Sequence, residues 1–342
     1  MKRNPGDLLI FIVKRLMTMV VLLFGATFIV FLISHVMVSD PAVIWAGKHA
    51  SKAEIAAVTN EYHLKAPIYV QYYYYMKGII SGNWGYNTVT GAPVLSQILH
   101  YFPATLELVL GALFIMTLIG IPLGVLAASR QGKLTDHLIR AFYLSGWATP
   151  TFLGSIILVL IFGLYIRVLP DVGMFSSSLK PPPTITGMPV LDSLLAGNIP
   201  DFVNAVEHLI LPAVSLAFLN FGIATRMTRA SMLEVFSMDY IKAARSKGLT
   251  ERIVLFRHAL RNALTSTVTV LALLTGSLLS GTVVIEEIFA WPGIGTYAYN
   301  SILLSDYPAI IGVTIFFTSG VILSNLVADI LYAVLDPKVE WG

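Results

Sequence analysis

The first candidates for chemistry are four polar side chains in or beside long apolar stretches: Glu107, Glu286, Asn325 and Asp329. An ionisable group inside a membrane segment is costly, and it commonly serves an ion, proton or substrate path. Asn325 and Asp329 share a helix face with Tyr332 and Asp336, because the steps between them are four, three and four residues. A proton-driven carrier could use that face. The alternative is a polar stripe that packs near the cytoplasmic end and pairs with an arginine.

The two glutamates leave more than one interpretation open. Glu107 follows Pro103 at the outer boundary of its apolar stretch, where we expect it to cap a helix or lie at the interface. Glu286 closes another apolar stretch. It could meet a cationic substrate or the rim of a docking protein, or it could have a structural role.

Patterns for catalysis or metal binding are missing from the sequence. It contains no cysteine, which excludes disulfides and thiolate metal sites. Its seven histidines are scattered without ligand spacing, and no GxxxxGK[ST] phosphate loop occurs. No catalytic triad or carboxylate pair is recognisable either. We therefore expect no catalytic residue, no metal site, no cofactor in this chain and no enzyme activity of its own.

Positive charge is densest in KAARSKGLTERIVLFRHALRNAL, residues 242–264, with six Lys or Arg. The apolar spacing before it predicts an amphipathic helix, which Gly248 would end in the left-handed conformation. Thr250 would cap a second helix that carries Glu251 in its first turn. This bent pair could bind DNA as a helix-turn-helix, lie on anionic lipid, or dock a cytoplasmic partner. Its place between membrane spans disfavours DNA, but charge alone does not separate the other two.

The elements that must position these residues are membrane helices. The chain is 56% hydrophobic and 12% charged, with a mean hydropathy of +0.78. A soluble domain would be about a quarter charged, so this composition excludes a water-soluble fold. Six stretches are long and apolar enough to cross a bilayer. They are Leu16–Ser39, Leu108–Ser129, Ala141–Ile166, His208–Thr225, Asn262–Ile285 and Tyr307–Ala328.

The basic residues indicate the orientation of these six spans. Sixteen Lys and Arg fall in the segments on one side, and six fall on the other. Because cytoplasmic loops carry the excess of basic residues, both termini are expected in the cytoplasm. The first span is too long for a signal peptide and lacks a cleavage pattern, so we expect a retained helix.

Smaller patterns predict local structure. Ser51 and Glu54 form a capping box that would open a short outer helix. The run Tyr72 to Tyr75 could stack on a sugar or peptide, or could anchor the chain at the membrane interface. GNWGYNTVTGAPV is expected to be a loop. Gly120 and Gly124 form a GxxxG pair that allows close helix contact, within the subunit or across a dimer.

The basic segment resembles the EAA loop of permease subunits in ATP-binding-cassette importers. Lys242-Ala243-Ala244 stands at the family's Glu-Ala-Ala and Gly248 at its glycine, whereas Arg261-Asn262 replaces the common Pro-Asn. AARSKGL with RHALRNAL is similar to the B-type subunit of dipeptide, oligopeptide and nickel importers. FPATLEL, GIPLGVLAA, HLILPA, FAWPGIGTYAYNSIL, DYPAIIGV and NLVADILYAVLDPK resemble its segments in the same order, so the similarity covers nearly the whole chain.

This resemblance implies an all-α integral membrane protein with six transmembrane helices and the type I importer permease fold. The bent segment would be the coupling helix, seated on a cytoplasmic ATPase. The coupling residues it implies are Asp239, Lys242, Ala243, Ala244, Lys247, Gly248, Arg257, His258 and Asn262.

The implied partners are a second, non-identical permease, two ATP-binding subunits that bind ATP and Mg, an external substrate-binding protein and the lipid bilayer, with no nucleic acid. The expected divisions are a first segment and span at 1–39, an outer loop region at 40–102, a core at 103–336 with the coupling loop at 226–262, and a tail at 337–342. Peptide is the expected substrate, with oligosaccharides or nickel complexes as alternatives. An ion-coupled transporter using Asp329 and Glu107, or a scaffold without a pathway, would be different classes of protein.

Overall fold

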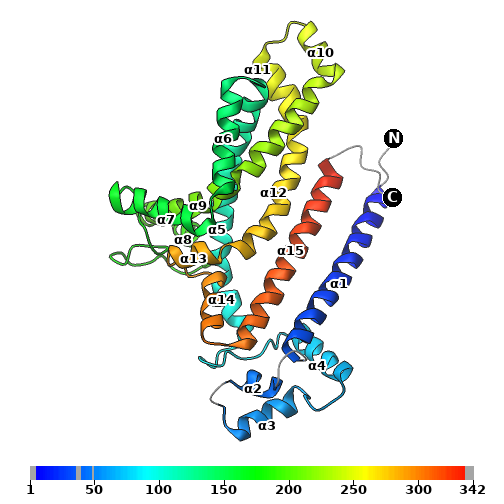
Figure 1. Ribbon diagram of the computed structural model, residues 1–342, viewed down its shortest axis with the longest axis vertical. Helices are drawn as coiled ribbons and strands as arrows, with labels where there is room; N and C mark the ends of the chain where they lie inside the picture. The colour runs from blue at the N-terminus through cyan, green and yellow to red at the C-terminus, as the bar shows by residue number, and fades with distance from the viewer. Residues whose placement is uncertain (1–4, 36–39, 48–49, 336–342) are drawn as a thin grey trace.

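A computed structural model describes residues 5–35, 40–47 and 50–335, and these are organised as helices. The start of α1 (Pro5–His35) and the end of α15 (Tyr307–Leu335) lie together (Figure 1). Both point toward the end of the molecule that carries α10 (Asp239–Ser246) and α11 (Glu251–Ile253). The opposite end carries the short helices α2 (Pro41–Ala46), α3 (Lys52–Glu61) and α4 (Ile68–Ser81).

Five helical segments of the described chain are long and apolar enough to cross a membrane. They lie in α1, in α5 (Val94–Ser129), in α9 (Ile199–Ser237), in the continuous segment Glu251–Gly281 that ends with α12 (Arg261–Gly281), and in α15. The five match the first, second, fourth, fifth and sixth predicted spans.

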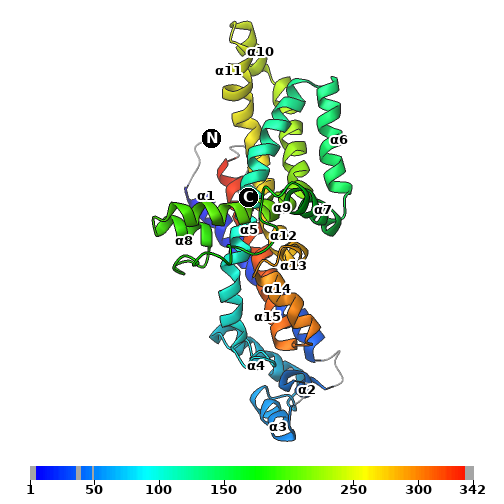
Figure 2. The same cartoon turned by 90° about the vertical axis from the view of Figure 1, so that its left-hand side faces the viewer.

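The third predicted span, Ala141–Ile166, is not a straight helix. Helix α6 (Leu134–Ala148) is followed by α7 (Thr151–Leu158) and the π-helix η1 (Val159–Tyr165), and the two halves are bent by 108°. Figure 2 shows α7 lying across the direction of α6. The bend falls at Thr149-Pro150, because a proline disfavours helical geometry at the preceding residue. Six spans result only if this bent pair counts as one.

The second and fourth spans are longer than their apolar windows. Helix α5 begins directly after Pro93, inside the range assigned to the outer loop. Helix α9 begins at Ile199, where the Asn198 side chain accepts a hydrogen bond from the Asp201 amide. The Asn198 cap stabilises the start of α9, whereas no side chain caps α5. Both helices are longer than a window that is bounded by the nearest charged residues.

The core forms where α5 packs along α9. A Cβ added at Gly120 would lie 2.9 Å from Ala224 Cβ, and one added at Gly124 would lie 2.5 Å from Thr228 Cβ. The GxxxG pair therefore lets α5 approach α9 within one subunit. Helix α12 packs against α15, and α15 packs against α1.

The outer region confirms the expected capping box and the expected loop. Ser51 and Glu54 form the capping box at the start of α3. The tyrosine run lies on α4, where Tyr72 meets Phe28 and Phe31 of α1 edge-on, with both ring centroids at 5.2 Å. Tyr72 thus packs α4 against the first span, a contact that differs from both roles expected for the tyrosine run. The GNWGYNTVTGAPV segment is a loop until α5 begins at Val94.

The last helices follow α12. Helix α13 (Val283–Ile288) ends before the tight turn around Trp291, and α14 (Ile294–Leu303) precedes α15. Earlier in the chain, α8 (Pro189–Leu195) comes between η1 and α9. These short helices surround the polar groups described below.

Candidate coupling elbow and polar sites

The basic segment forms an elbow, which we define as residues 238–262. Helix α9 ends at Ser237, and Met238 takes an extended conformation with ψ 144°, so α10 leaves in a new direction. Gly248 has φ +75°, the left-handed region that glycine adopts without strain. Helix α11 and the π-helix η2 (Val254–Leu260) then lead into α12. In Figure 1 this elbow is the extreme end of the molecule.

The elbow differs from the predicted hinge in two details. The amphipathic stretch before Gly248 is interrupted at Met238 instead of forming a single helix. Thr250 does precede the second helix, but its side chain makes no capping hydrogen bond. Instead, Glu251 accepts a 2.8 Å hydrogen bond from Arg245 Nε and so closes the turn around the glycine.

Most of the expected coupling residues are exposed in this chain. The exposed ones are Asp239, Lys242, Ala243, Lys247, Gly248, Arg257 and Asn262. His258 is half-buried, and Ala244 is buried. Ala244 packs with Ile241 into an apolar cluster of α5, α9 and α12 residues, so it seats α10 on the helix ends. The elbow therefore has a buried inner face and an exposed outer face, on which charged residues stand beside the apolar side chains of Leu249, Ile253 and Phe256.

A hydrogen bond ties the two arms of the elbow together. Asn262 Nδ2 donates to the Tyr240 hydroxyl at 2.6 Å, and Lys242 Nζ pairs with Asp239 at 2.9 Å on the outer face. The Arg245 guanidinium also lies 5.6 Å from the centroid of the Phe236 ring. The sequence motif identified Asn262 but not Tyr240, because 22 residues separate the two and no periodic pattern connects them.

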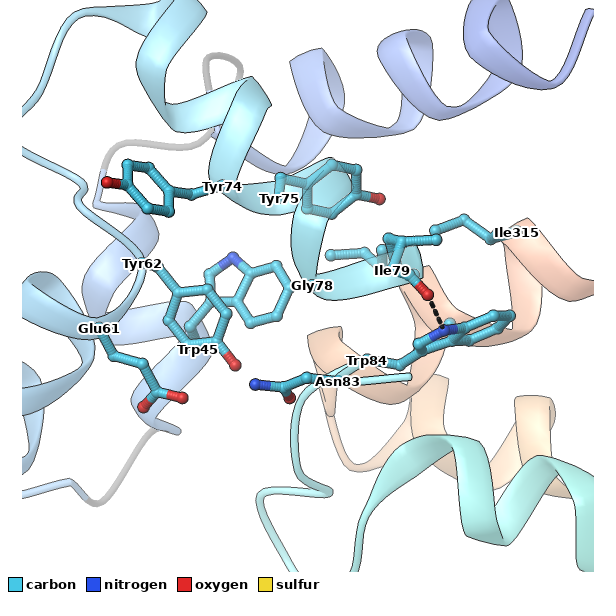
Figure 3. Close-up of a pocket in the computed structure, with 12 residues that line it drawn as sticks. Trp45, Glu61, Tyr62, Tyr74, Tyr75, Gly78, Ile79, Asn83, Trp84 and Ile315 are labelled. Atoms are coloured by element: carbon cyan, nitrogen blue, oxygen red, sulfur yellow. Dashed lines mark hydrogen bonds between the residues drawn. The ribbon is translucent and has the colours of Figure 1, made fainter. Parts of the chain in front are cut away.

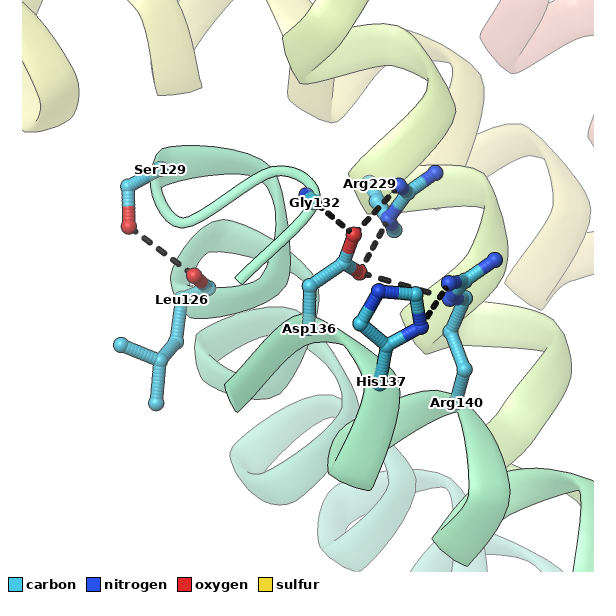
Figure 4. Close-up of polar contacts among 7 residues, drawn as sticks. All are labelled: Leu126, Ser129, Gly132, Asp136, His137, Arg140 and Arg229. Atoms are coloured by element: carbon cyan, nitrogen blue, oxygen red, sulfur yellow. Dashed lines mark hydrogen bonds and ion pairs between the residues drawn. The ribbon is translucent and has the colours of Figure 1, made fainter. Parts of the chain in front are cut away.

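A buried ion pair that the sequence analysis missed lies near the elbow end of α6. Asp136 is 1% exposed, and Arg229 of α9 donates to its two oxygens at 2.8 Å each. The Gly132 amide donates a third hydrogen bond at 3.0 Å, and Arg140 lies at 3.7 Å (Figure 4). This carboxylate joins the α5–α6 turn to α9. In the sequence, Asp136 stands out only as an acidic residue among the basic residues Lys133 and Arg140.

Glu107 is buried and caps another element. Its Oε1 accepts a 2.8 Å hydrogen bond from the Val190 amide in the first turn of α8. Asp192 on α8 accepts hydrogen bonds from the amide and hydroxyl of Thr186, both at 2.7 Å, and from the Gly187 amide at 3.1 Å. The carboxylates of α5 and α8 thus hold the segment that precedes α9.

Glu286 is fully buried and does not face an opening in this structure. Its carboxylate accepts hydrogen bonds from the hydroxyls of Thr105 and Thr282, both at 2.8 Å, and from the Thr296 amide at 2.9 Å. A Cβ at Gly295 would lie 2.7 Å from the carboxylate, so the turn before α14 wraps closely around it. This is the structural alternative that the sequence had left open.

The polar face of α15 meets the first span. Arg15 Nη1 of α1 lies 3.3 Å from Asp329 Oδ2. Asn325 and Tyr332 are exposed, and Asp336 lies outside the described residues. The polar-stripe interpretation expected an arginine partner for this face, and Arg15 is present.

No group of His, Cys, Asp or Glu with metal-binding geometry occurs among the residues that the structure describes. The polar residues described above instead make hydrogen bonds and ion pairs between helices, and the elbow is exposed at one end of the molecule.

Comparisons with known proteins agree with this arrangement. The family model for "binding-protein-dependent transport system inner membrane component" matches residues 120–341, and the model of its N-terminal region matches residues 8–109. The chain is 42% identical to the probable D,D-dipeptide transport system permease protein DdpB of Escherichia coli (strain K12), over 96% of this chain and 97% of that protein.

Two further relatives match over similar lengths. The dipeptide transport system permease protein DppB of the same strain is 36% identical over 96% of this chain and 98% of its own. The oligopeptide transport system permease protein AppB of Bacillus subtilis (strain 168) is 34% identical over 97% of this chain and 99% of its own.

Helices, elbow and relatives together define a multi-pass cell-membrane permease of the ATP-binding-cassette importer class. More narrowly, the chain belongs to the family of binding-protein-dependent transport system inner membrane components.

Proposed function

We propose that this chain is one of two permease subunits of an ATP-driven peptide importer and forms half of its translocation pathway. The observation that carries the proposal is the elbow, whose inner face is packed on the helix ends while its charged outer face is exposed. The dipeptide and oligopeptide permeases to which the chain is similar support peptide over oligosaccharide or nickel complexes as the substrate.

The elbow end lies in the cytoplasm in this proposal, together with both termini. Two cytoplasmic ATPase subunits bind ATP with Mg and receive the elbow in a groove, and an external binding protein delivers the peptide. ATP shifts the conformation because it binds the closed ATPase pair more tightly than the open pair. The elbow carries that closure as a rigid lever, since Ala244, Arg245 and Asn262 fix its two arms to each other and to the bundle.

The direct test uses introduced cysteines, because the chain has none of its own. Lys247→Cys lies on the exposed elbow and Lys52→Cys on the exposed outer helix α3. We expect Lys247→Cys to crosslink to a co-purifying ATPase and to resist an impermeant thiol reagent in intact cells. Lys52→Cys should react with that reagent and form no such crosslink. An elbow labelled from outside, or a purified transport complex without an ATPase, would overturn the proposal.

A further inference from the structure

An aromatic cleft lies at the end of the molecule opposite the elbow. It opens to the surface and lies between the outer helices α2–α4 and the first turns of α15. Among its walls are the rings of Trp45, Tyr62, Tyr74, Tyr75 and Trp84 (Figure 3). Binding pockets for small molecules are commonly lined by apolar and aromatic side chains such as these.

The aromatic rings that line the cleft pack against one another and against helices α2–α4. The Trp45 and Tyr62 rings lie 4.7 Å apart between centroids, and Tyr75 of α4 is buried. Trp84 Nε1 donates a 3.1 Å hydrogen bond to the Ile79 carbonyl, drawn as a dashed line in Figure 3. The cleft is therefore built from fixed rings, so a ligand that enters it finds a formed surface.

The charge of the cleft selects the kind of ligand. Glu61 is the single charged residue among the described residues that line it, and its side chain is exposed. In the part of the chain that the structure describes, no basic side chain forms an ion pair with Glu61. Aromatic faces attract cations, and an unpaired carboxylate does the same. An ammonium group on an apolar body fits both features, whereas an anion fits neither.

We infer that this cleft binds the α-ammonium end of a short peptide on the outer face of the permease. The inference rests on the proposed function, which places α2–α4 outside the cell. An N-terminal ammonium beside a small apolar side chain would contact Glu61 and the rings of Trp45 and Tyr62. The cleft would thus hold an arriving substrate by a group that every unmodified peptide carries.

The test uses the purified permease pair in nanodiscs, without binding protein, and alanylalanine as the probe. Two tryptophans line the cleft, so we expect a saturable change in tryptophan fluorescence. N-acetylalanylalanine, which lacks the ammonium, should bind at least threefold more weakly. Glu61→Gln should weaken the apparent Kd about threefold, the size of an exposed charge interaction. Glu54→Gln is the matched control: it lies on the same helix, does not line the cleft, and keeps a residue type that can complete the capping box.

Equal binding of the acetylated peptide, no saturable response, or equal Kd values for Glu61→Gln and Glu54→Gln would each overturn the inference. ATP hydrolysis by the assembled complex shows that each variant is folded. Because peptide uptake through the whole complex is measured separately, an importer that works without this binding step would refute the cleft and leave the proposed function standing.

Discussion

Asn262 donates a 2.6 Å hydrogen bond to the hydroxyl of Tyr240 and so joins α10 to the first turn of α12. The bond spans the elbow from one arm to the other, while the chain between the two residues turns at Gly248. A lever transmits force only if its arms keep their angle. Two further polar links join the arms: the Tyr240 hydroxyl donates a 3.5 Å hydrogen bond to the His258 carbonyl, and Arg245 pairs with Glu251.

Tyr240→Phe removes this hydroxyl and keeps the ring. A hydrogen bond of this kind contributes about 1 kcal/mol, so we expect stimulated ATP hydrolysis in the reconstituted complex to fall about threefold to fivefold. Tyr299→Phe, at another exposed tyrosine on α14, is the control and should leave the rate unchanged. Equal rates for the two variants would show that the Tyr240–Asn262 link is not part of the lever.

Gly248 offers a test of the turn itself. At φ +75° a side chain is strained, yet nothing lies within 4 Å of a Cβ placed there, so a substitution meets backbone strain without a clash. The left-handed conformation costs an L-residue about 1–2 kcal/mol, and we expect Gly248→Val to lower stimulated hydrolysis about tenfold. Gly248→Asn should retain most of it, because asparagine tolerates this conformation.

Gly91→Val is the matched control for the glycine test. Gly91 has φ +68°, is also open, and lies in the outer loop before α5. Gly91→Val introduces a similar backbone strain far from the elbow, so stimulated ATP hydrolysis should be retained. A loss of hydrolysis equal to that of Gly248→Val would mean that general destabilisation, and not the elbow, limits the rate.

The Asp136–Arg229 pair predicts a large effect on stability. Asp136→Asn leaves the Arg229 guanidinium, whose side chain is 20% exposed, without its bidentate partner. Removing one member of a buried pair costs about 3–5 kcal/mol, measurable as a lower unfolding temperature in detergent. Asp239→Asn breaks the exposed pair with Lys242 and should cost less than about 1 kcal/mol. Similar losses for the two variants would contradict the burial argument.

The sequence predicted the helical class and the apolar spans, because a helix that crosses a bilayer needs about 20 consecutive apolar residues. It did not predict the bend between α6 and α7, since the apolar run continues through Ala148 and Pro150 without charge. It also could not predict the burial of Glu286. Its partner Thr105 is 181 residues away, and only tertiary packing brings the two together. The EAA-like motif located the elbow. It did not predict the Tyr240–Asn262 and Asp136–Arg229 contacts, because these pairs are far apart in the sequence and no periodic pattern connects them.

The segment before α9 should depend on pH through Asp192. Burial alone would raise the pKa of this carboxyl, but hydrogen bonds from Thr186 and Gly187 outweigh it and lower the pKa below its usual value of 3.8. The charged form is therefore stabilised in the folded state. That contribution is complete above about pH 3.8 and is lost as the pH falls through the lowered folded pKa.

Hydrogen exchange measures this dependence at the Thr186 and Gly187 amides. We expect them to be protected at pH 7 and to open at acid pH, after correction for the intrinsic exchange rate. In Asp192→Asn the Gly187 amide loses its acceptor, so faster exchange should appear already at pH 7. Asp171→Asn, in the preceding loop, should change neither pattern. Protection in Asp192→Asn that equals the parent protein would refute this role.

The contact between Arg15 and Asp329 separates an importer driven by ATP from a carrier driven by ions. Both side chains are partly exposed, so the 3.3 Å pair should contribute less than about 1 kcal/mol to stability. Asp329→Asn should therefore leave ATP-dependent peptide uptake into proteoliposomes within about twofold of the parent, and Arg15→Gln should do the same. In a proton-coupled carrier that uses Asp329, the first variant would abolish uptake while the second would not. A selective loss in Asp329→Asn, together with uptake that follows a proton gradient without ATP, would make this carboxylate a transport residue instead of a brace between α1 and α15.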